Sequence, residues 1–160
     1  MEYKDKFDIE EIIVEDRKTG KEKPVTIYKP KYEKGKIFAP LQNKYLEAKP
    51  EEKVRQEFIC RLINDYGYTL EQMAQEVQLT SSSRGTGRAS ADIVVWRTKE
   101  EKEQNKTAFL VVELKAEAIT LKPEDFYQGY NYATWSRAKL FVISNGKIVK
   151  IYKTIEEELP

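Results

Sequence analysis

The sequence contains no histidine and only one cysteine, Cys60, among its 160 residues. Without histidine, the chain cannot use Ser-His-Asp or Cys-His catalysis, histidine-ligated zinc or iron, or a histidine general base. A single cysteine excludes an internal disulfide and every cysteine-rich zinc site. If the chain is an enzyme, carboxylates, lysine, tyrosine or a hard metal ion must carry its chemistry.

The sequence also lacks a long apolar run and an excess of either charge. Its longest purely apolar run is residues 108–112, far short of the roughly 20 residues of a membrane span, and no secretory signal follows Met1. Lysine and arginine number 28 against 27 acidic residues, which leaves a net charge of +1. We therefore expect a soluble cytoplasmic protein whose affinity for nucleic acid depends on local patches.

Apolar periodicity and turn residues predict an α/β fold with one central mixed sheet. Residues 1–49 are expected to form a β-rich extension, with a hairpin of residues 9–14 and 25–28 followed by an arm or loop. Residues 50–160 are expected to form the main domain, whose first helix begins at Pro50 and ends at Gly67. The later elements are strands near 74–80, 91–97 and 108–115, a solvated turn at 99–106, a helix from 123 to about 135, and a hairpin of 139–144 and 147–152 with Asn-Gly in its tight turn.

One charged tripeptide stands out within this pattern. Glu113-Leu114-Lys115 is the one acid-x-Lys tripeptide, of six in the chain, that lies inside an apolar strand. Strands 91–97 and 108–115 flank the charged turn, and an antiparallel hairpin symmetric about that turn places Asp92 opposite Glu113. A slip of one residue would move one of the two acids to the other face of the sheet.

The juxtaposition of these residues has a chemical consequence. Two opposed carboxylates repel each other unless a cation lies between them, and a site with oxygen ligands alone suits Mg²⁺ or Mn²⁺. A neighbouring lysine can orient water or stabilise a charged phosphorus centre. The pattern thus indicates metal-assisted phosphodiester hydrolysis with Asp92 and Glu113 as metal ligands and Lys115 beside them. The alternative is a salt bridge among solvated charges at the strand ends.

An ordered set of motifs supports the first of these interpretations. Asp92, followed after 20 intervening residues by Glu113-x-Lys115, resembles the PD-(D/E)xK nuclease signature, with Ala91 in place of the proline. Over about residues 50–153 the chain resembles the N-terminal domain of type I restriction enzyme R (HsdR) subunits. The matching segments are residues 51–58 with Gly67-Tyr68, residues 91–95, residues 111–116, the Gln-x-x-x-Tyr motif at 128–132, and Ser144-Asn145-Gly146.

This resemblance implies a restriction-endonuclease-like sheet flanked by helices and a Mg²⁺- or Mn²⁺-dependent DNA endonuclease. Asp92 and Glu113 would hold the metal, and Lys115 would position the water or stabilise the transition state. Gln128 and Tyr132 would support the site or touch DNA, although Tyr132 fits the core of an ordinary amphipathic helix equally well.

Nucleases that the chain resembles often place a further acid on the first helix. Glu52 and Glu57 both qualify and helical phase does not separate them. We favour Glu57 because it lies nearer the apolar centre of the helix. Glu76, on the following strand, is a third candidate. For each of the three, a solvated surface charge is the simpler interpretation.

Double-stranded DNA is the expected partner, and Arg84 and Arg88 are expected to face its phosphates, unless these arginines serve only solubility. The resemblance adds a motor domain and modification and specificity subunits. The sequence has no Gly-Lys-Ser/Thr phosphate loop, so we expect no ATP site and no translocation by this chain, whether it is a fragment or a small stand-alone relative. Two alternatives stay open: a binding or subunit-docking module that is inactive without partners, and a nickase, repair or RNA-directed nuclease.

Overall fold

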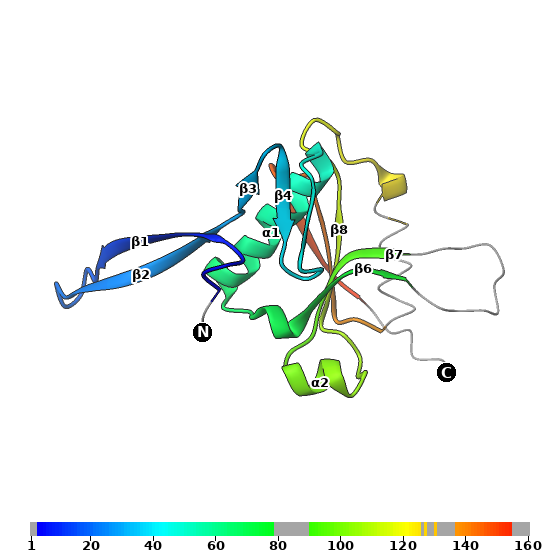
Figure 1. Cartoon of the computed structure of the whole chain (residues 1–160). Coiled ribbons are helices and arrows are strands. Elements are labelled where there is room, and N and C mark those ends of the chain that lie inside the picture. Colours follow the sequence, from blue (N-terminus) through cyan, green and yellow to red (C-terminus); the bar gives the residue numbers. More distant parts are fainter. Residues whose placement is uncertain (1–2, 79–89, 126, 128–129, 131–136, 155–160) are drawn as a thin grey trace, which may run out of the picture. The chain divides into compact units, whose positions relative to one another are not determined.

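The computed structural model describes residues 3–78, 90–125, 127, 130 and 137–154, as drawn in Figure 1. Contacts divide the chain into two compact units, residues 1–68 and 69–160. The domain boundary expected between residues 49 and 50 stays a prediction. Within the described ranges, no helix is long and apolar enough to cross a membrane.

The first unit begins with an antiparallel strand pair. Strands β1 (Asp8–Glu15) and β2 (Glu22–Lys29) pair from Asp8 opposite Lys29 to Glu15 opposite Glu22. The two apolar patches and the polar, glycine-containing stretch between them indicate this pairing in the sequence. Every residue of β1 is exposed.

A second sheet follows where we expected an arm or loop. Strands β3 (Tyr32–Glu33), β4 (Lys36–Ala39) and β5 (Lys44–Glu47) form a three-stranded antiparallel sheet. The expectation of no regular structure here was wrong, because strands of two and four residues are too short to show a period. In the turns between them, Lys34 and Asn43 have a left-handed backbone conformation. We did not predict this conformation from the sequence.

Helix α1 (Pro50–Tyr66) has the ends that the sequence predicts. Pro50 and the acids Glu51 and Glu52 occupy its first turn, where a proline and negative charge are favourable. Gly67 ends the helix with a φ of 73°, and the Tyr68 N–H donates to the Leu62 carbonyl oxygen at 3.1 Å. This is the glycine-dependent end that satisfies the last helical carbonyls.

The second unit is built on a five-stranded mixed sheet with the order β10-β9-β8-β7-β6. Strands β8 and β9 run parallel, and the other neighbours are antiparallel. The predicted mixed α/β class is therefore confirmed. The strands are β6 (Met73–Gln78), β7 (Ser90–Val95), β8 (Leu110–Leu114), β9 (Leu140–Ser144) and β10 (Val149–Lys153).

Side chains on both faces of this sheet are buried, as expected for central strands that carry continuous apolar runs. One face carries a cluster that includes Val94, Trp96, Val111, Phe141 and Ile143. The other face carries Ile93, Val95, Val112, Leu114 and Val142, each at most 3% exposed. Polar side chains on such strands must therefore lie near a strand end or have partners.

The connection between β7 and β8 contains a short helix, α2 (Lys99–Glu103), where we expected only a solvated turn. The Glu101 N–H donates to the Thr98 hydroxyl oxygen at 3.0 Å, which caps the helix. The spacing Thr98-x-x-Glu101 is the pattern of a capping box and could have predicted this turn of helix. A shorter 3₁₀ helix, η1 (Leu70–Gln72), precedes β6.

The β9–β10 connection also differs in detail from the predicted tight turn. Ser144 pairs with Val149, and of the Asn-Gly pair Gly146 alone has a positive φ, 91°. Asn145 is only 5% exposed, and its side-chain oxygen accepts from the N–H groups of Lys147 and Ile148 at 3.0 and 2.9 Å. The asparagine therefore acts through its side chain and not through a left-handed backbone.

The predicted second helix is described only in part. Residues 123–125, 127 and 130 are helical. They belong to the crossover between the parallel strands β8 and β9, which such a strand pair requires. The remaining positions of the predicted helix up to Trp135 lie outside the described residues.

Candidate active site

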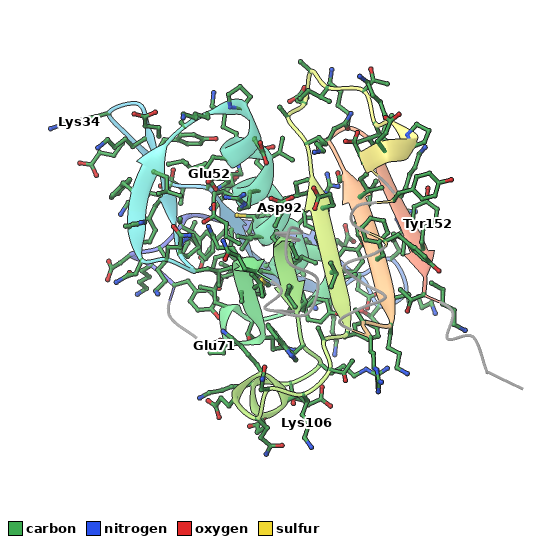
Figure 2. The ribbon with its side chains drawn as sticks, turned by 90° about the vertical axis from the view of Figure 1, so that its right-hand side faces the viewer. Lys34, Glu52, Glu71, Asp92, Lys106 and Tyr152 are labelled. Atoms are coloured by element: carbon green, nitrogen blue, oxygen red, sulfur yellow. The ribbon has the colours of Figure 1, made fainter. Side chains whose placement is uncertain are left out.

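Strands β7 and β8 pair in the register that the sequence predicts. Ile93 lies opposite Val112, and Val95 lies opposite Leu110, so one further step brings Asp92 opposite Glu113. At this level the Leu114 N–H donates to Asp92 Oδ2 at 2.6 Å. Strand alternation places both acids on the face that carries Val94 and Val111. The two carboxylates therefore stand at the end of an apolar face, and Figure 2 labels Asp92 there.

Lys115 directly follows β8 and completes the predicted trio. Its N–H donates to the Ser144 carbonyl oxygen at 2.9 Å, which extends the parallel pairing of β8 with β9. Its Nζ lies 3.8 Å from Glu113 Oε1 and 3.5 Å from Asp125 Oδ1. These three side chains are between 13% and 25% exposed, so the charges are partly shielded from water but still reachable.

Asp125 is the residue that sequence reasoning did not assign to the site. Its Oδ2 accepts from the Lys122 N–H at 3.0 Å, and its own N–H donates to the Lys122 carbonyl oxygen at 3.0 Å. This is the back-reaching acid of a helix N-terminus. The run Pro123-Glu124-Asp125 indicates the helix start in the sequence, but its proximity to Lys115 depends on the folded crossover.

The donor set can be tested against a metal ion. Asp92 and Glu113 offer carboxylate oxygens, the hard ligands that suit Mg²⁺ or Mn²⁺. Across the described part of the chain, no group of three or more Asp, Glu or Cys side chains could hold a metal ion. A pair of carboxylates is nonetheless the usual protein contribution to a Mg²⁺ site, which fills its other positions with water and substrate phosphate. The chemistry of this donor pair therefore suits such an ion.

Residues 50–159 match the family model of the type I restriction enzyme R protein N terminus (HSDR_N). The chain belongs to this family. The matched range includes α1, all five strands of the mixed sheet and the Asp92, Glu113 and Lys115 trio, and it confirms the resemblance found in the motifs. Searches of curated proteins and of solved structures found no match.

Glu76 lies on β6, the strand next to β7, which carries Asp92. The β6–β7 pairing includes Gln75 with Ile93 and Val77 with Ala91, which leaves Glu76 at the level of Asp92. Glu76 is exposed and has a φ of 52°, an uncommon backbone conformation for a residue other than glycine. Its role in the site stays a prediction.

The two acids proposed on the first helix differ in their surroundings within the first unit. Glu52 uses both carboxylate oxygens: Arg55 Nη1 donates to one at 2.7 Å, and Gln56 Nε2 donates to the other at 2.9 Å. Glu57 is exposed. Burial, with a smaller contribution from the Glu57 charge, raises the pKa of Cys60 to about 12, so this thiol is unreactive near neutral pH. The role of Glu57 as the site's helix acid stays a prediction.

Four predicted functional residues fall outside the part of the domain that the structure describes. They are Arg84, Arg88, Gln128 and Tyr132. Their proposed contacts with DNA, and the supporting role of Gln128, therefore stay predictions.

Proposed function

We propose that this domain is a Mg²⁺- or Mn²⁺-dependent DNA endonuclease that hydrolyses phosphodiester bonds with an activated water. The observation that carries the proposal is the hydrogen bond from the Leu114 N–H to Asp92. It joins β7 to β8, and the register of these two strands supports a site in which Asp92, Glu113 and Lys115 act together. Membership in a restriction enzyme family supports DNA as the substrate and a restriction-endonuclease-like fold.

Each residue of the trio has a separate task in this proposal. Asp92 and Glu113 would hold the divalent ion, which when bound supplies Lewis-acid activation of water and phosphate. The backbone N–H of Leu114 fixes the orientation of Asp92. The Lys115 ammonium would hold the attacking water or a non-bridging phosphate oxygen, and its partial burial strengthens that interaction.

The remaining predicted residues complete the proposal. Gln128 and Tyr132 would support the site or contact DNA, Glu57 would add a carboxylate from α1, and Arg84 and Arg88 would contact phosphates. In a type I restriction-modification system, a motor domain and the modification and specificity subunits would deliver the DNA to the site.

The decisive experiment measures divalent-dependent nicking of supercoiled plasmid by the purified chain. We expect Asp92→Ala, Glu113→Ala and Lys115→Ala each to lower the nicking rate at least about 100-fold, as the loss of a group that acts on the transition state does. Glu117→Ala is the matched control, because Glu117 is an exposed acid paired with Lys147. If Lys115→Ala nicks DNA as fast as the wild-type chain, the proposed role of Lys115 is wrong.

A second candidate is a DNA-binding or subunit-docking module that has kept the nuclease fold without activity of its own. The ion pairs of Lys115 with Glu113 and Asp125 favour it, because they can balance these charges without a metal ion. Titration with Mn²⁺ in the presence of a non-cleavable DNA duplex separates the two. A nuclease binds the ion through Asp92 and Glu113, whereas a docking module binds DNA equally well with and without it.

A further inference from the structure

We infer that Asp125 is a positioning residue that holds the Lys115 ammonium at the site from an element other than the strand of Glu113. This inference rests on the proposed nuclease function, because it gives Lys115 a fixed place beside the reacting phosphate. Asp125 itself contacts neither the metal ligands nor the scissile bond in this proposal.

The contacts of Lys115 are the first step of the argument. Within the described residues, its Nζ forms ion pairs with Glu113 at 3.8 Å and with Asp125 at 3.5 Å. Both distances lie at or beyond the limit of a hydrogen bond. The ammonium is therefore shared between two carboxylates, with its donors still able to reach a third acceptor such as a water or a phosphate oxygen.

The second step concerns what a lysine needs in order to act at a defined point. Its side chain is a flexible four-carbon stem, and Glu113 lies only two residues away on the same strand face. A single partner on the same strand leaves the stem free to swing. A second partner on a separate element fixes the position of the ammonium, and catalysis by a positioned group depends steeply on such placement.

The third step is the rigidity of Asp125. One oxygen, Oδ2, accepts from the Lys122 N–H at 3.0 Å, while the other, Oδ1, faces Lys115. The capping bond thus fixes the side chain that meets the lysine. If Glu113 binds a cation, that cation neutralises its charge. Of the two carboxylates paired with Lys115, Asp125 is then the one whose charge still attracts the ammonium.

The molecule contains a natural comparison for this pair. Lys147 and Glu117 are also 3.5 Å apart, but their side chains are 68% and 61% exposed, against 25% and 18% for Lys115 and Asp125. Exposed pairs of this kind order their side chains little. Because the two ion pairs have the same distance but different exposure, comparing them shows how shielding from water affects the mobility of the lysine side chain.

The test uses Asp125→Asn, which keeps an oxygen to cap Lys122 but removes the charge that faces Lys115. NMR of lysine side-chain ammonium groups in the metal-free chain, with the Lys115 signal identified by its loss in Lys115→Arg, reports the mobility of this group. We expect Asp125→Asn to shift the Lys115 signal and lower its order parameter, with the melting temperature retained. Glu117→Gln, the matched control, should change Lys147 alone.

Kinetics supply the second measurement, on the full chain with Mg²⁺ and plasmid DNA. We expect Asp125→Asn to lower kcat roughly 10- to 100-fold, the scale of a misplaced catalytic group, while KM for DNA changes less than about twofold. A purely structural role would lower the melting temperature and leave kcat of the folded fraction unchanged.

The outcomes of the two measurements are distinct. A folded Asp125→Asn chain with an unchanged Lys115 signal overturns the inference, whatever its activity. If Asp125→Asn does not fold, Asp125→Gln, whose side-chain oxygen can also reach back to the Lys122 N–H as the glutamine of a capping box does, takes its place under the same criteria. If the wild-type chain cleaves DNA neither alone nor together with its motor domain and partner subunits, the proposed function fails on that result, and the NMR comparison alone decides whether Asp125 holds Lys115.

Discussion

Asp92 accepts a hydrogen bond from the N–H of Leu114, a residue with no exposed surface. At 2.6 Å this is a short bond to a charged acceptor, and such bonds are stronger than those between neutral groups. By the register of β7 and β8 the same residue stands at the level of Glu113, where like charges are unfavourable. Asp92 therefore influences stability in two opposite directions before any metal binds.

Two substitutions at Asp92 separate these effects. Asp92→Asn keeps an oxygen acceptor for Leu114 and removes one like charge, so we expect the free energy of unfolding to change by less than about 1 kcal/mol or to rise. Asp92→Ala leaves the buried N–H without its acceptor and should cost about 1–3 kcal/mol. Urea unfolding in EDTA measures both values.

The same variants test the proposed metal site. We expect millimolar Mn²⁺ to raise the melting temperature of the wild-type chain and to have a smaller effect on Asp92→Asn, since a ligand stabilises only the state that binds it. Equal shifts in the two proteins would show that Asp92 is not a ligand.

At the scale of elements, α1 shows how a few residues define an end. Gly67 has a φ of 73°, and apart from its own chain neighbours and the adjoining helix backbone, no heavy atom of the described residues lies within 4 Å of the position where a Cβ would stand. A side chain at this position would therefore meet no steric obstacle beyond its own backbone. The requirement for glycine is conformational, because other residues rarely adopt this backbone.

We predict that Gly67→Ala lowers the free energy of unfolding by about 1 kcal/mol, the cost of a left-handed conformation for a residue with a Cβ. Gly67→Asn should cost less, since asparagine tolerates this region better. Urea unfolding measures the difference, with Lys53→Ala, at an exposed position of the same helix, as the control. An Ala variant as stable as wild type would contradict the conformational explanation.

The elements that could be predicted are those with characteristic residues at both ends or with apolar strands placed symmetrically about a turn. The ends of α1 follow from a proline, two acids and a glycine, and the β7–β8 register follows from two apolar strands around one charged turn. The pairing of Asp92 with Glu113 was therefore available from the sequence. Strands β3 to β5 were not, because their few residues show no period.

The contact between Asp125 and Lys115 could not be predicted from the sequence. Asp92, Glu113 and Lys115 come from adjacent antiparallel strands, whose geometry follows from local spacing. Asp125 reaches Lys115 only through the crossover that joins the parallel strands β8 and β9. Such a contact depends on how the crossover packs on the sheet, and no spacing along the chain encodes it.

At the scale of the whole molecule, charge is nearly balanced. The net charge of +1 gives no general attraction to DNA, so the proposed binding of DNA would rest on a few phosphate contacts made by local groups. Arg84 and Arg88 precede Asp92 in a stretch from Ser81 to Ser90 that contains no acid. They are the residues that the sequence suggests for such contacts.

This interpretation predicts how binding depends on salt. Each neutralised phosphate releases counterions, so the slope of log K against log salt is about −0.9 per contact on duplex DNA. Replacing both Arg84 and Arg88 by Ala should therefore weaken DNA binding in EDTA and reduce the magnitude of the slope by up to about 2. Arg17→Ala with Lys18→Ala, in the exposed turn between β1 and β2, removes the same charge and serves as the control. If both double variants reduce the slope equally, net charge alone governs binding and the two arginines make no specific phosphate contacts.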